Sequence, residues 1–116
     1  MNITEGDIYW VTFPATEARE QAGHRPALIV QSERFSQSLP TVLVVPITSN
    51  LRAASFSGTI RIDPDEHNGL TAPSVLLVFQ LRAIDKRRLQ DKAGKISPTQ
   101  LKQVSRMIDL LLGRNL

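Results

Sequence analysis

Cysteine is absent from the 116 residues of this chain, and several other residue types with characteristic chemistry are scarce. The lack of cysteine excludes disulfide bonds, thiolate catalysis, zinc–cysteine sites and iron–sulfur clusters. Only two histidines are present, too few for a histidine-rich metal site, and aromatic residues make up 5% of the sequence. The motifs GxGxxG, GxxxxGK[ST], HExxH and GxSxG do not occur. The sequence therefore gives no sign of a glycine-rich phosphate loop, a zinc protease or a serine hydrolase.

Long apolar runs are missing as well. The longest, at residues 27–30 and 42–47, are far shorter than the ~20 apolar residues of a transmembrane helix. The opening segment, MNITEGD, has no basic start and no apolar stretch behind it, unlike a secretory signal peptide. We therefore expect a cytoplasmic protein.

The remaining composition is that of an ordinary globular protein. Hydrophobic residues make up 41% and charged residues 22% of the sequence, which argues against disorder. The length fits one domain, which we place at residues 1–116. The formal net charge is +3, which favours a polyanionic partner such as nucleic acid only weakly.

Alternating or continuous apolar residues dominate the first two thirds of the chain and predict β-strands. The polar stretch 15–23 predicts a loop, and residues 32–37 fit one helical turn. Proline cannot donate to a strand ladder, so Pro46 predicts an edge strand or a bulge. Residues 82–95 are basic and irregular, with a turn expected at 86–89. The expected strands cover residues 8–13, 26–31, 41–48, 59–62 and 74–83, with a short one near 94–96.

The last segment changes to a helical period. Ser97 is a good N-cap, Pro98 suits the first helical position, and Gln100 completes a capping-box pattern. Gly113 is placed to end the helix. The apolar face of this helix consists of Leu101, Val104, Ile108, Leu111 and Leu112. The sequence thus predicts a mainly β protein, a small antiparallel barrel or sandwich with a C-terminal amphipathic helix over one face.

The first candidate site residue lies where a polar loop enters an apolar strand. Arg25 precedes Pro26, which holds Arg25 in an extended conformation at the rim of the sheet. Its guanidinium presents a planar fork of donors that suits phosphate oxygens. The alternative is structural, with Arg25 paired to Glu17 or Glu20 to hold the loop.

The second candidate is the run Thr48-Ser49-Asn50 at the end of a buried strand. Its hydroxyl and amide groups can donate hydrogen bonds to an anion, or they can close a turn. The acidic residues at 63, 65 and 66 are interpreted as a solvated turn rather than a magnesium site.

Two blocks carry a resemblance to a known family. EQAGHRPA at residues 20–27 and PITS at residues 46–49 resemble the signature blocks of the MazF/PemK family of toxin endoribonucleases. GDIYWV at 6–11, QLRAID at 80–85 and the C-terminal helix lie where the family has equivalents. The resemblance therefore covers almost the whole chain.

The resemblance implies an SH3-like β-barrel of the CcdB/PemK type that forms a homodimer. It implies a toxin that cuts single-stranded RNA, including mRNA, at selected sequences without a metal or other cofactor. Attack by the ribose 2′-hydroxyl would leave a 2′,3′-cyclic phosphate and a 5′-hydroxyl. An acidic antitoxin would block the site.

For the residues of the site, the resemblance and the chemistry of the side chains agree. Arg25 and Thr48 are expected to stabilise the pentavalent phosphorane, and Glu20 is expected to act as the base, with His24 as a second candidate for that role. The expected RNA contacts are His24, Ser49, Asn50, Gln80, Arg82 and Arg87. The basic residues at 82 and 86–88 are an expected target for the antitoxin, or simply a solvated face.

The chain departs from the family pattern at Phe79, where an aspartate often precedes the glutamine that matches Gln80. A mechanism that depends on this aspartate is therefore not expected. The alternative to a ribonuclease is a non-catalytic SH3-like binding module, that is, a degenerate toxin. A gyrase poison of the CcdB type is not expected, because the chain ends in Arg-Asn-Leu rather than Trp-Gly-Ile and its only tryptophan is Trp10.

Overall fold

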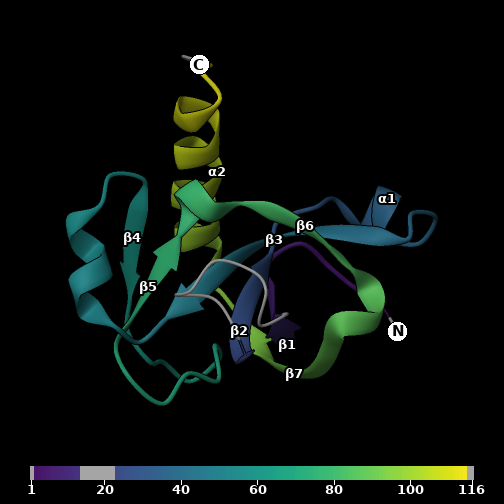
Figure 1. Ribbon diagram of the computed structural model, residues 1–116, viewed down its shortest axis with the longest axis horizontal. Helices are drawn as coiled ribbons and strands as arrows, with labels where there is room; N and C mark the ends of the chain where they lie inside the picture. Colours follow the sequence, from purple (N-terminus) through teal and green to yellow (C-terminus); the bar gives the residue numbers. More distant parts are fainter. Residues whose placement is uncertain (1, 14–22, 115–116) are drawn as a thin grey trace.

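The computed structural model describes residues 2–13 and 23–114, which form a strongly bent antiparallel sheet with one long helix beside it (Figure 1). The strands are β1 (Asp7–Phe13), β2 (Gly23–Ile29), β3 (Thr41–Thr48), β4 (Thr59–Ile62), β5 (Ser74–Leu77), β6 (Arg82–Asp85) and β7 (Leu89–Lys95). The helices are α1 (Glu33–Ser36) and α2 (Pro98–Leu111), and the 3₁₀ turns are η2 (Leu51–Ser55), η3 (Val78–Gln80) and η4 (Lys86–Arg88). Neighbouring strands follow the order β4-β5-β3-β2-β1-β7, and β6 also pairs with β3. The expected mainly β architecture with a C-terminal helix is confirmed.

Strand β3 is central, so the edge position predicted from Pro46 is wrong. The Val30 N–H donates to the Leu43 carbonyl, and hydrogen-bonded pairs alternate with non-bonded pairs along the ladder between β2 and β3. The Ala27–Pro46 pair is therefore non-bonded, and the proline nitrogen faces away from β2. On that other side, β6 pairs with the first half of β3 and β5 with its last two residues. Pro46 lies between these two partners, where no ladder hydrogen bond is lost.

The single strand expected at residues 74–83 is three elements. Strand β5 ends at Leu77, the turn η3 follows, and β6 begins at Arg82. Both strands pair with the same side of β3, but at different halves of it. The chain must therefore step along β3, and η3 makes that step without a glycine or proline to signal it. The Phe79 N–H donates to the Gly58 carbonyl at 3.1 Å, which fixes the turn against the segment before β4.

The region from residue 82 to 95 is also more regular than expected. The predicted turn is present as η4, but β6 precedes it and β7 covers all of residues 89–95. Strand β7 pairs only with β1 among the described strands, and most of its side chains are exposed. An edge strand of this kind needs few apolar residues, so its sequence lacks the pattern of a buried strand.

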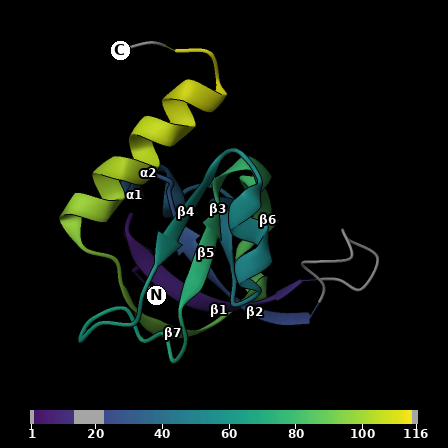
Figure 2. The ribbon, with the colours of Figure 1, turned by 90° about the vertical axis from the view of Figure 1, so that its left-hand side faces the viewer.

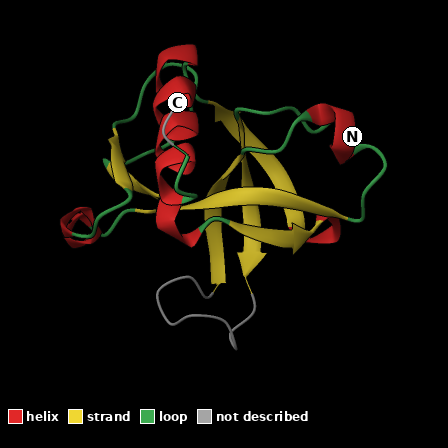
Figure 3. Cartoon of the chain, turned by 90° about the horizontal axis from the view of Figure 1, so that it is seen from above, coloured by secondary structure: helices red, strands yellow, loops and turns green. Residues whose placement is uncertain are grey.

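Side chains that alternate along β1, β2 and β3 fill two separate cores. The first core holds Tyr9, Val11, Phe13, Ala27, Ile29, Val42 and Val44, together with Ile3, Ile84 and Leu89. The second core holds Ile8, Leu28, Val45, Ile47, Ile62, Leu76, Val78, Ile96 and Val104. Helix α2 covers the second core. Figure 2 shows the C-terminal end of α2 projecting beyond the sheet, and Figure 3 shows the sheet and α2 from above.

At the start of α2, one of the two hydrogen bonds of the predicted capping box is present. The Ser97 hydroxyl accepts a hydrogen bond from the Gln100 N–H at 3.2 Å. The Gln100 side chain does not return to Ser97; it donates to the Arg61 carbonyl at 3.3 Å and ties the helix to β4. Leu111 and Leu112 are exposed, so the predicted apolar face extends beyond the surface that the sheet covers. None of the helices in the described residues is long and apolar enough to cross a membrane.

Candidate functional site

Strands β2 and β3 bring Arg25 and Thr48 to facing positions at one end of their ladder. The last paired residues are Ala27 and Pro46, and the same register carries Arg25 to the position opposite Thr48. This position is of the non-hydrogen-bonded kind, in which facing Cα atoms of a regular ladder lie about 4.5 Å apart. Because side chains alternate along a strand, both residues lie on the side of the sheet that faces the first core. By this extension of the register, the two residues predicted to stabilise the phosphorane come from facing positions of adjacent strands.

Arg25 lines a small cavity of about 170 Å³, which we call the arginine cavity. Its walls are Trp10, His24, Arg25, Pro26, Ile47, Ser49, Leu70, Thr71, Ala72 and Ser74. The His24 ring is exposed and lies 4.9 Å from the Trp10 ring, centroid to centroid. Arg25 is half-buried and forms no hydrogen bond or ion pair with any other described residue. Its guanidinium is thus available to an anion, in a cavity that also holds the predicted contacts His24 and Ser49.

Thr48 lines a second cavity of about 560 Å³, which we call the phenylalanine cavity. Its walls are Thr48, Asn50, Arg52, Ala53, Ser55, Phe56, Leu77, Phe79 and Gln80. The Thr48 hydroxyl oxygen accepts a hydrogen bond from the Asn50 N–H at 3.1 Å. This bond leaves the hydroxyl hydrogen for a further acceptor, and the structure shows none among the described residues. The side chain is almost fully buried, so its orientation is fixed by packing.

The predicted contact residues divide between the two cavities and the strand beside them. His24 and Ser49 lie in the arginine cavity, whereas Asn50 and Gln80 lie in the phenylalanine cavity. Arg82 faces Val44 of β3, and its guanidinium carbon lies 5.3 Å from the centroid of the Phe13 ring at the end of the first core.

Arg87 is not part of this group. It lies in η4, next to the end of β6 that pairs with Thr41, at the opposite end of β3 from Thr48. Seven steps along β3 separate Thr41 from Thr48, which corresponds to about 23 Å at ~3.3 Å per residue. The Arg87 guanidinium also binds Asp85 through two nitrogens, Nη2 at 2.8 Å and Nε at 3.1 Å. This side-chain bond and the Arg87 N–H lower the pKa of Asp85 to about 2. An RNA contact by Arg87 remains a prediction that this geometry does not support.

Glu20 lies outside the described residues, as does the partner Glu17 in the alternative structural interpretation of Arg25. The predicted loop at 15–23 is described only from Gly23, the first residue of β2. Of the two predicted bases, only His24 can thus be placed, in the arginine cavity with Arg25. No group of three or more histidine, aspartate or glutamate side chains able to hold a metal ion occurs within the described ranges.

Sequence reasoning did not identify the aromatic residues of the two cavities. Trp10 reads as one more residue of an alternating strand, and Phe56 and Phe79 come from segments that no motif connects. Phe79 was noted only as a departure from the family pattern, and not as the wall of a cavity. The fold brings Phe56 and Phe79 together at 5.6 Å between ring centroids.

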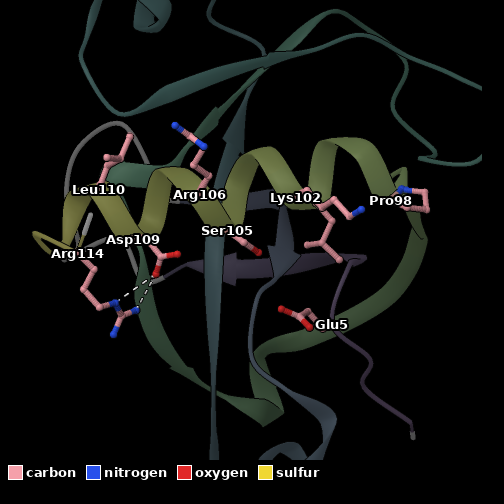
Figure 4. Close-up of a pocket in the computed structure, with 9 residues that line it drawn as sticks. Glu5, Pro98, Lys102, Ser105, Arg106, Asp109, Leu110 and Arg114 are labelled. Carbon is pink, nitrogen blue, oxygen red and sulfur yellow. Dashed lines mark hydrogen bonds and ion pairs between the residues drawn. The ribbon is translucent and has the colours of Figure 1, made fainter. Parts of the chain in front are cut away.

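A groove of about 600 Å³ runs along α2, away from all of these residues. Figure 4 shows Glu5 beside it and the side chains of Lys102, Ser105 and Asp109 along the helix. An ion pair of 3.0 Å between Asp109 and Arg114 closes one end. No predicted site residue lines this groove, so it does not form part of the candidate site.

Comparison with known proteins gives a consistent result. A family model described as "PemK-like, MazF-like toxin of type II toxin-antitoxin system" matches residues 4–112. An endoribonuclease MazF from Staphylococcus saprophyticus is 33% identical over 111 residues, which cover 96% of this chain and 92% of that protein. A crystal structure of MazF from Deinococcus radiodurans superposes with a TM-score of 0.80 at 24% identity, covering 97% of this chain and 98% of that one. A mycobacterial endoribonuclease in complex with its cognate antitoxin has a TM-score of 0.76 at 17% identity, covering 99% and 97% of the two chains. These structures confirm the predicted fold.

Proposed function

Because this chain belongs to the family of PemK-like and MazF-like toxins of type II toxin–antitoxin systems, we propose that it is an endoribonuclease that cuts single-stranded RNA at the end of strands β2 and β3. One observation supports the proposal: if the register of β2 and β3 is extended two residues beyond the Ala27–Pro46 pair, Arg25 comes opposite Thr48. A permanent cation and a hydroxyl donor thus come from adjacent strands, each in the wall of a cavity.

The reaction requires three events at one phosphodiester. The 2′-hydroxyl loses its proton and attacks phosphorus, a pentavalent phosphorane forms, and the bond from phosphorus to the 5′-oxygen breaks as that oxygen gains a proton. The products are a 2′,3′-cyclic phosphate and a 5′-hydroxyl. DNA lacks the attacking hydroxyl, so it is not cut by this route.

Arg25 and Thr48 act on the second of these events. The Arg25 guanidinium donates two parallel charge-assisted hydrogen bonds to the non-bridging oxygens, where negative charge accumulates. The Thr48 hydroxyl adds a neutral donor, held in place by the Asn50 N–H. Both donors belong to strands of the sheet, Arg25 to β2 and Thr48 to the last position of β3.

The proton transfers fall to Glu20 or His24. His24 lines the same cavity as Arg25, and its ring is oriented by Trp10. An imidazole accepts a proton from the 2′-hydroxyl or returns one to the 5′-oxygen. Holding the 2′-hydroxyl in line with the leaving oxygen supplies a further part of the rate.

Two protein partners belong to the proposal. Solved relatives include an endoribonuclease with its cognate antitoxin and a MazE–MazF complex, and we propose that an acidic antitoxin covers the Arg25 rim and the nearby basic residues. A folding-on-binding segment can wrap such a surface. We also propose a homodimer, in which the exposed Leu111 and Leu112 of α2 are covered by a second copy.

Incubation of the purified protein with a long single-stranded RNA in the presence of a chelator tests this function. Cleavage into discrete fragments is expected, and DNA of the same sequence should remain intact. Arg25→Ala, purified in parallel, controls for a contaminating ribonuclease. Intact RNA after incubation with the wild-type protein would contradict the proposal, and binding without cleavage would support the non-catalytic binding module instead.

A further inference from the structure

Two exposed aromatic rings stand beside Thr48 and are not used in the reaction described above. Phe56 is 61% exposed and Phe79 is 37% exposed. Their ring centroids are 5.6 Å apart and the planes are inclined by 46°. Both rings line the phenylalanine cavity together with Thr48. Large apolar side chains this exposed keep apolar surface in contact with water, which raises the question of what covers them.

The backbone holds this pair in position before any ligand arrives. The Phe79 N–H donates to the Gly58 carbonyl at 3.1 Å, and a Cβ atom on Gly58 would lie 3.0 Å from the Phe79 Cβ. Phe56 ends the turn η2, where its N–H donates to the Ala53 carbonyl at 3.1 Å. The Thr59 hydroxyl donates to the Phe56 carbonyl at 2.9 Å. These bonds hold the backbone from which both rings project.

Apart from Ala53 and Leu77, the other walls of the phenylalanine cavity are polar or cationic, and none of them is acidic. The Asn50 side-chain oxygen accepts a hydrogen bond from the Arg52 N–H at 3.2 Å, and the amide NH₂ group of Asn50 has no partner among the described residues. The Arg52 guanidinium likewise has no ion-pair partner within residues 2–13 and 23–114. Aromatic faces, an amide donor and a free cation thus surround one hollow of about 560 Å³.

We propose, on the basis of the endoribonuclease function above, that the Phe56–Phe79 pair is the stacking surface for the unpaired nucleobase next to the scissile phosphate. A phosphate held by Thr48 delivers the base of one adjoining nucleotide into the cavity that Thr48 lines. That base stacks on the exposed rings, the Asn50 amide meets its edge, and Arg52 meets the next phosphate. Stacking on aromatic side chains is how proteins bind single-stranded nucleic acid.

An apolar side chain of the antitoxin is the other occupant to consider. Such a group would cover the rings, but it would bury the Asn50 amide and the Arg52 guanidinium without hydrogen-bond partners, which is costly. A nucleotide provides a π-face, a polar edge and a phosphate, and therefore satisfies all three kinds of wall at once. This match favours RNA as the occupant.

Phe79 thereby has a role that differs from that of an acid at the same position. A carboxylate there would repel the phosphate, whereas the ring adds a binding surface. The consequence is that Phe79 acts on RNA affinity and on the choice of the adjoining base, not on proton transfer.

The test measures binding, so that it does not depend on the rate of cleavage. The probe is a fluorescein-labelled RNA of the sequence that the wild-type protein cuts, with a 2′-O-methyl group at the cut nucleotide to prevent cleavage. Phe79→Leu keeps an apolar side chain but removes the ring, and we expect it to weaken binding about 5- to 100-fold, the range for loss of one stacked base. Phe79→Tyr should bind within about threefold of the wild type, because it retains the ring.

Two further probes each carry one abasic nucleotide. It lies directly before the cut in one probe and directly after the cut in the other. With the probe that lacks the stacked base, wild-type protein and Phe79→Leu should bind equally, because there is nothing left to stack. Phe35→Leu is the matched control. Phe35 is 54% exposed in α1, outside both cavities, and this variant should bind as the wild type does. Because phenylalanine neutralises no phosphate, the salt dependence of binding should be the same in Phe79→Leu and in the wild type.

The outcomes separate this inference from the proposed function. If the wild-type protein cuts RNA but Phe79→Leu binds the first probe within twofold of wild type, the stacking surface is refuted and the function stands. The stacking surface is also refuted, and the function stands, if Phe79→Leu weakens binding of both abasic probes to the same extent. It is refuted likewise if Phe79→Leu weakens the binding of the antitoxin and not that of RNA. If the wild-type protein cuts no RNA, the function fails and this inference fails with it. A second variant, Phe56→Leu, gives the same pattern if the pair acts as one surface.

Discussion

Replacement of Arg25 by alanine should abolish most RNA cleavage and leave the fold intact. Arg25 is half-buried at the start of β2 and makes no hydrogen bond or ion pair within the described chain. Removing its side chain therefore breaks no side-chain hydrogen bond or ion pair that the structure shows and little packing. The free energy of unfolding should change by no more than ~0.5 kcal/mol, as for an ordinary surface substitution.

The effect on the rate should be much larger. One donor aimed at the charge of a transition state contributes ~2.7–4 kcal/mol, which is a rate factor of ~100–1,000. Arg25→Lys should recover little, because a single ammonium cannot reproduce two parallel hydrogen bonds. Thr48 provides a neutral donor at about half that strength, so Thr48→Val should lose ~10–30-fold. Thr48→Ser keeps the hydroxyl and should retain most of the activity.

The assay is single-turnover cleavage of one labelled RNA with enzyme in excess, in chelator, with a thermal melt of each variant. Thr48 also accepts the Asn50 N–H, so Thr48→Val should lose ~1 kcal/mol of stability, whereas Arg25→Ala should not. Full activity in a folded Arg25→Ala protein would refute the site. A strongly lowered melting temperature for this variant would support the structural role instead, in which Arg25 holds the loop.

Three further predictions concern stability, titration and assembly. Gly69 has φ +72°, and a Cβ atom there would lie 2.0 Å from the Ala93 carbonyl oxygen; Gly69→Ala should therefore lower the free energy of unfolding in urea by at least ~2 kcal/mol. Gly23→Ala should cost less, because φ is +94° but no atom lies within 4 Å. Burial raises the pKa of Tyr9, the only tyrosine in the sequence, so the absorbance of its side chain should titrate with a midpoint above pH 10. The free energy of unfolding should fall as the pH rises from 10 through this midpoint, and Tyr9→Phe should reduce that loss. A midpoint at pH 10 or below would contradict this. Light scattering should give twice the chain mass for the wild type and the single mass for Leu112→Glu, since Leu112 is 56% exposed at the end of α2; a monomeric wild type would rule out the dimer.

The sequence predicted those helices and strands whose own pattern of capping and apolar residues matches their place in the fold. The cap at Ser97 and the spacing of apolar residues define α2, and the apolar runs define β2 and β3 within a few residues. The break after Leu77 could not be predicted, because it arises from β5 and β6 sharing one side of β3. The edge position predicted from Pro46 was wrong for the same reason. Only the pairing of β3 with three strands shows that the missing N–H of Pro46 removes no ladder hydrogen bond.

The sequence singled out Arg25 and Thr48 as candidate site residues but gave no sign of the aromatic walls beside them. Arg25 and Thr48 lie in motifs, and the register then brings them together. The Phe56–Phe79 pair comes from two turns more than 20 residues apart, and only the folded chain shows that they share a cavity. Arg87 is the opposite case: its place in a basic run pointed to RNA, whereas in the structure its side chain is bound to Asp85.

The most direct measurement is the chemistry of the cut ends on a substrate with one altered ribose. The RNA carries a 2′-O-methyl group only at the nucleotide that precedes a mapped cut, and the fragments are analysed by mass spectrometry in chelator. Attack by the 2′-hydroxyl predicts that this bond becomes resistant, that other cut sites in the same molecule remain sensitive, and that each cut leaves a 2′,3′-cyclic phosphate and a 5′-hydroxyl. Continued cleavage at the methylated nucleotide, or fragments with a 3′-hydroxyl and a 5′-phosphate, would contradict the proposed reaction at Arg25 and Thr48.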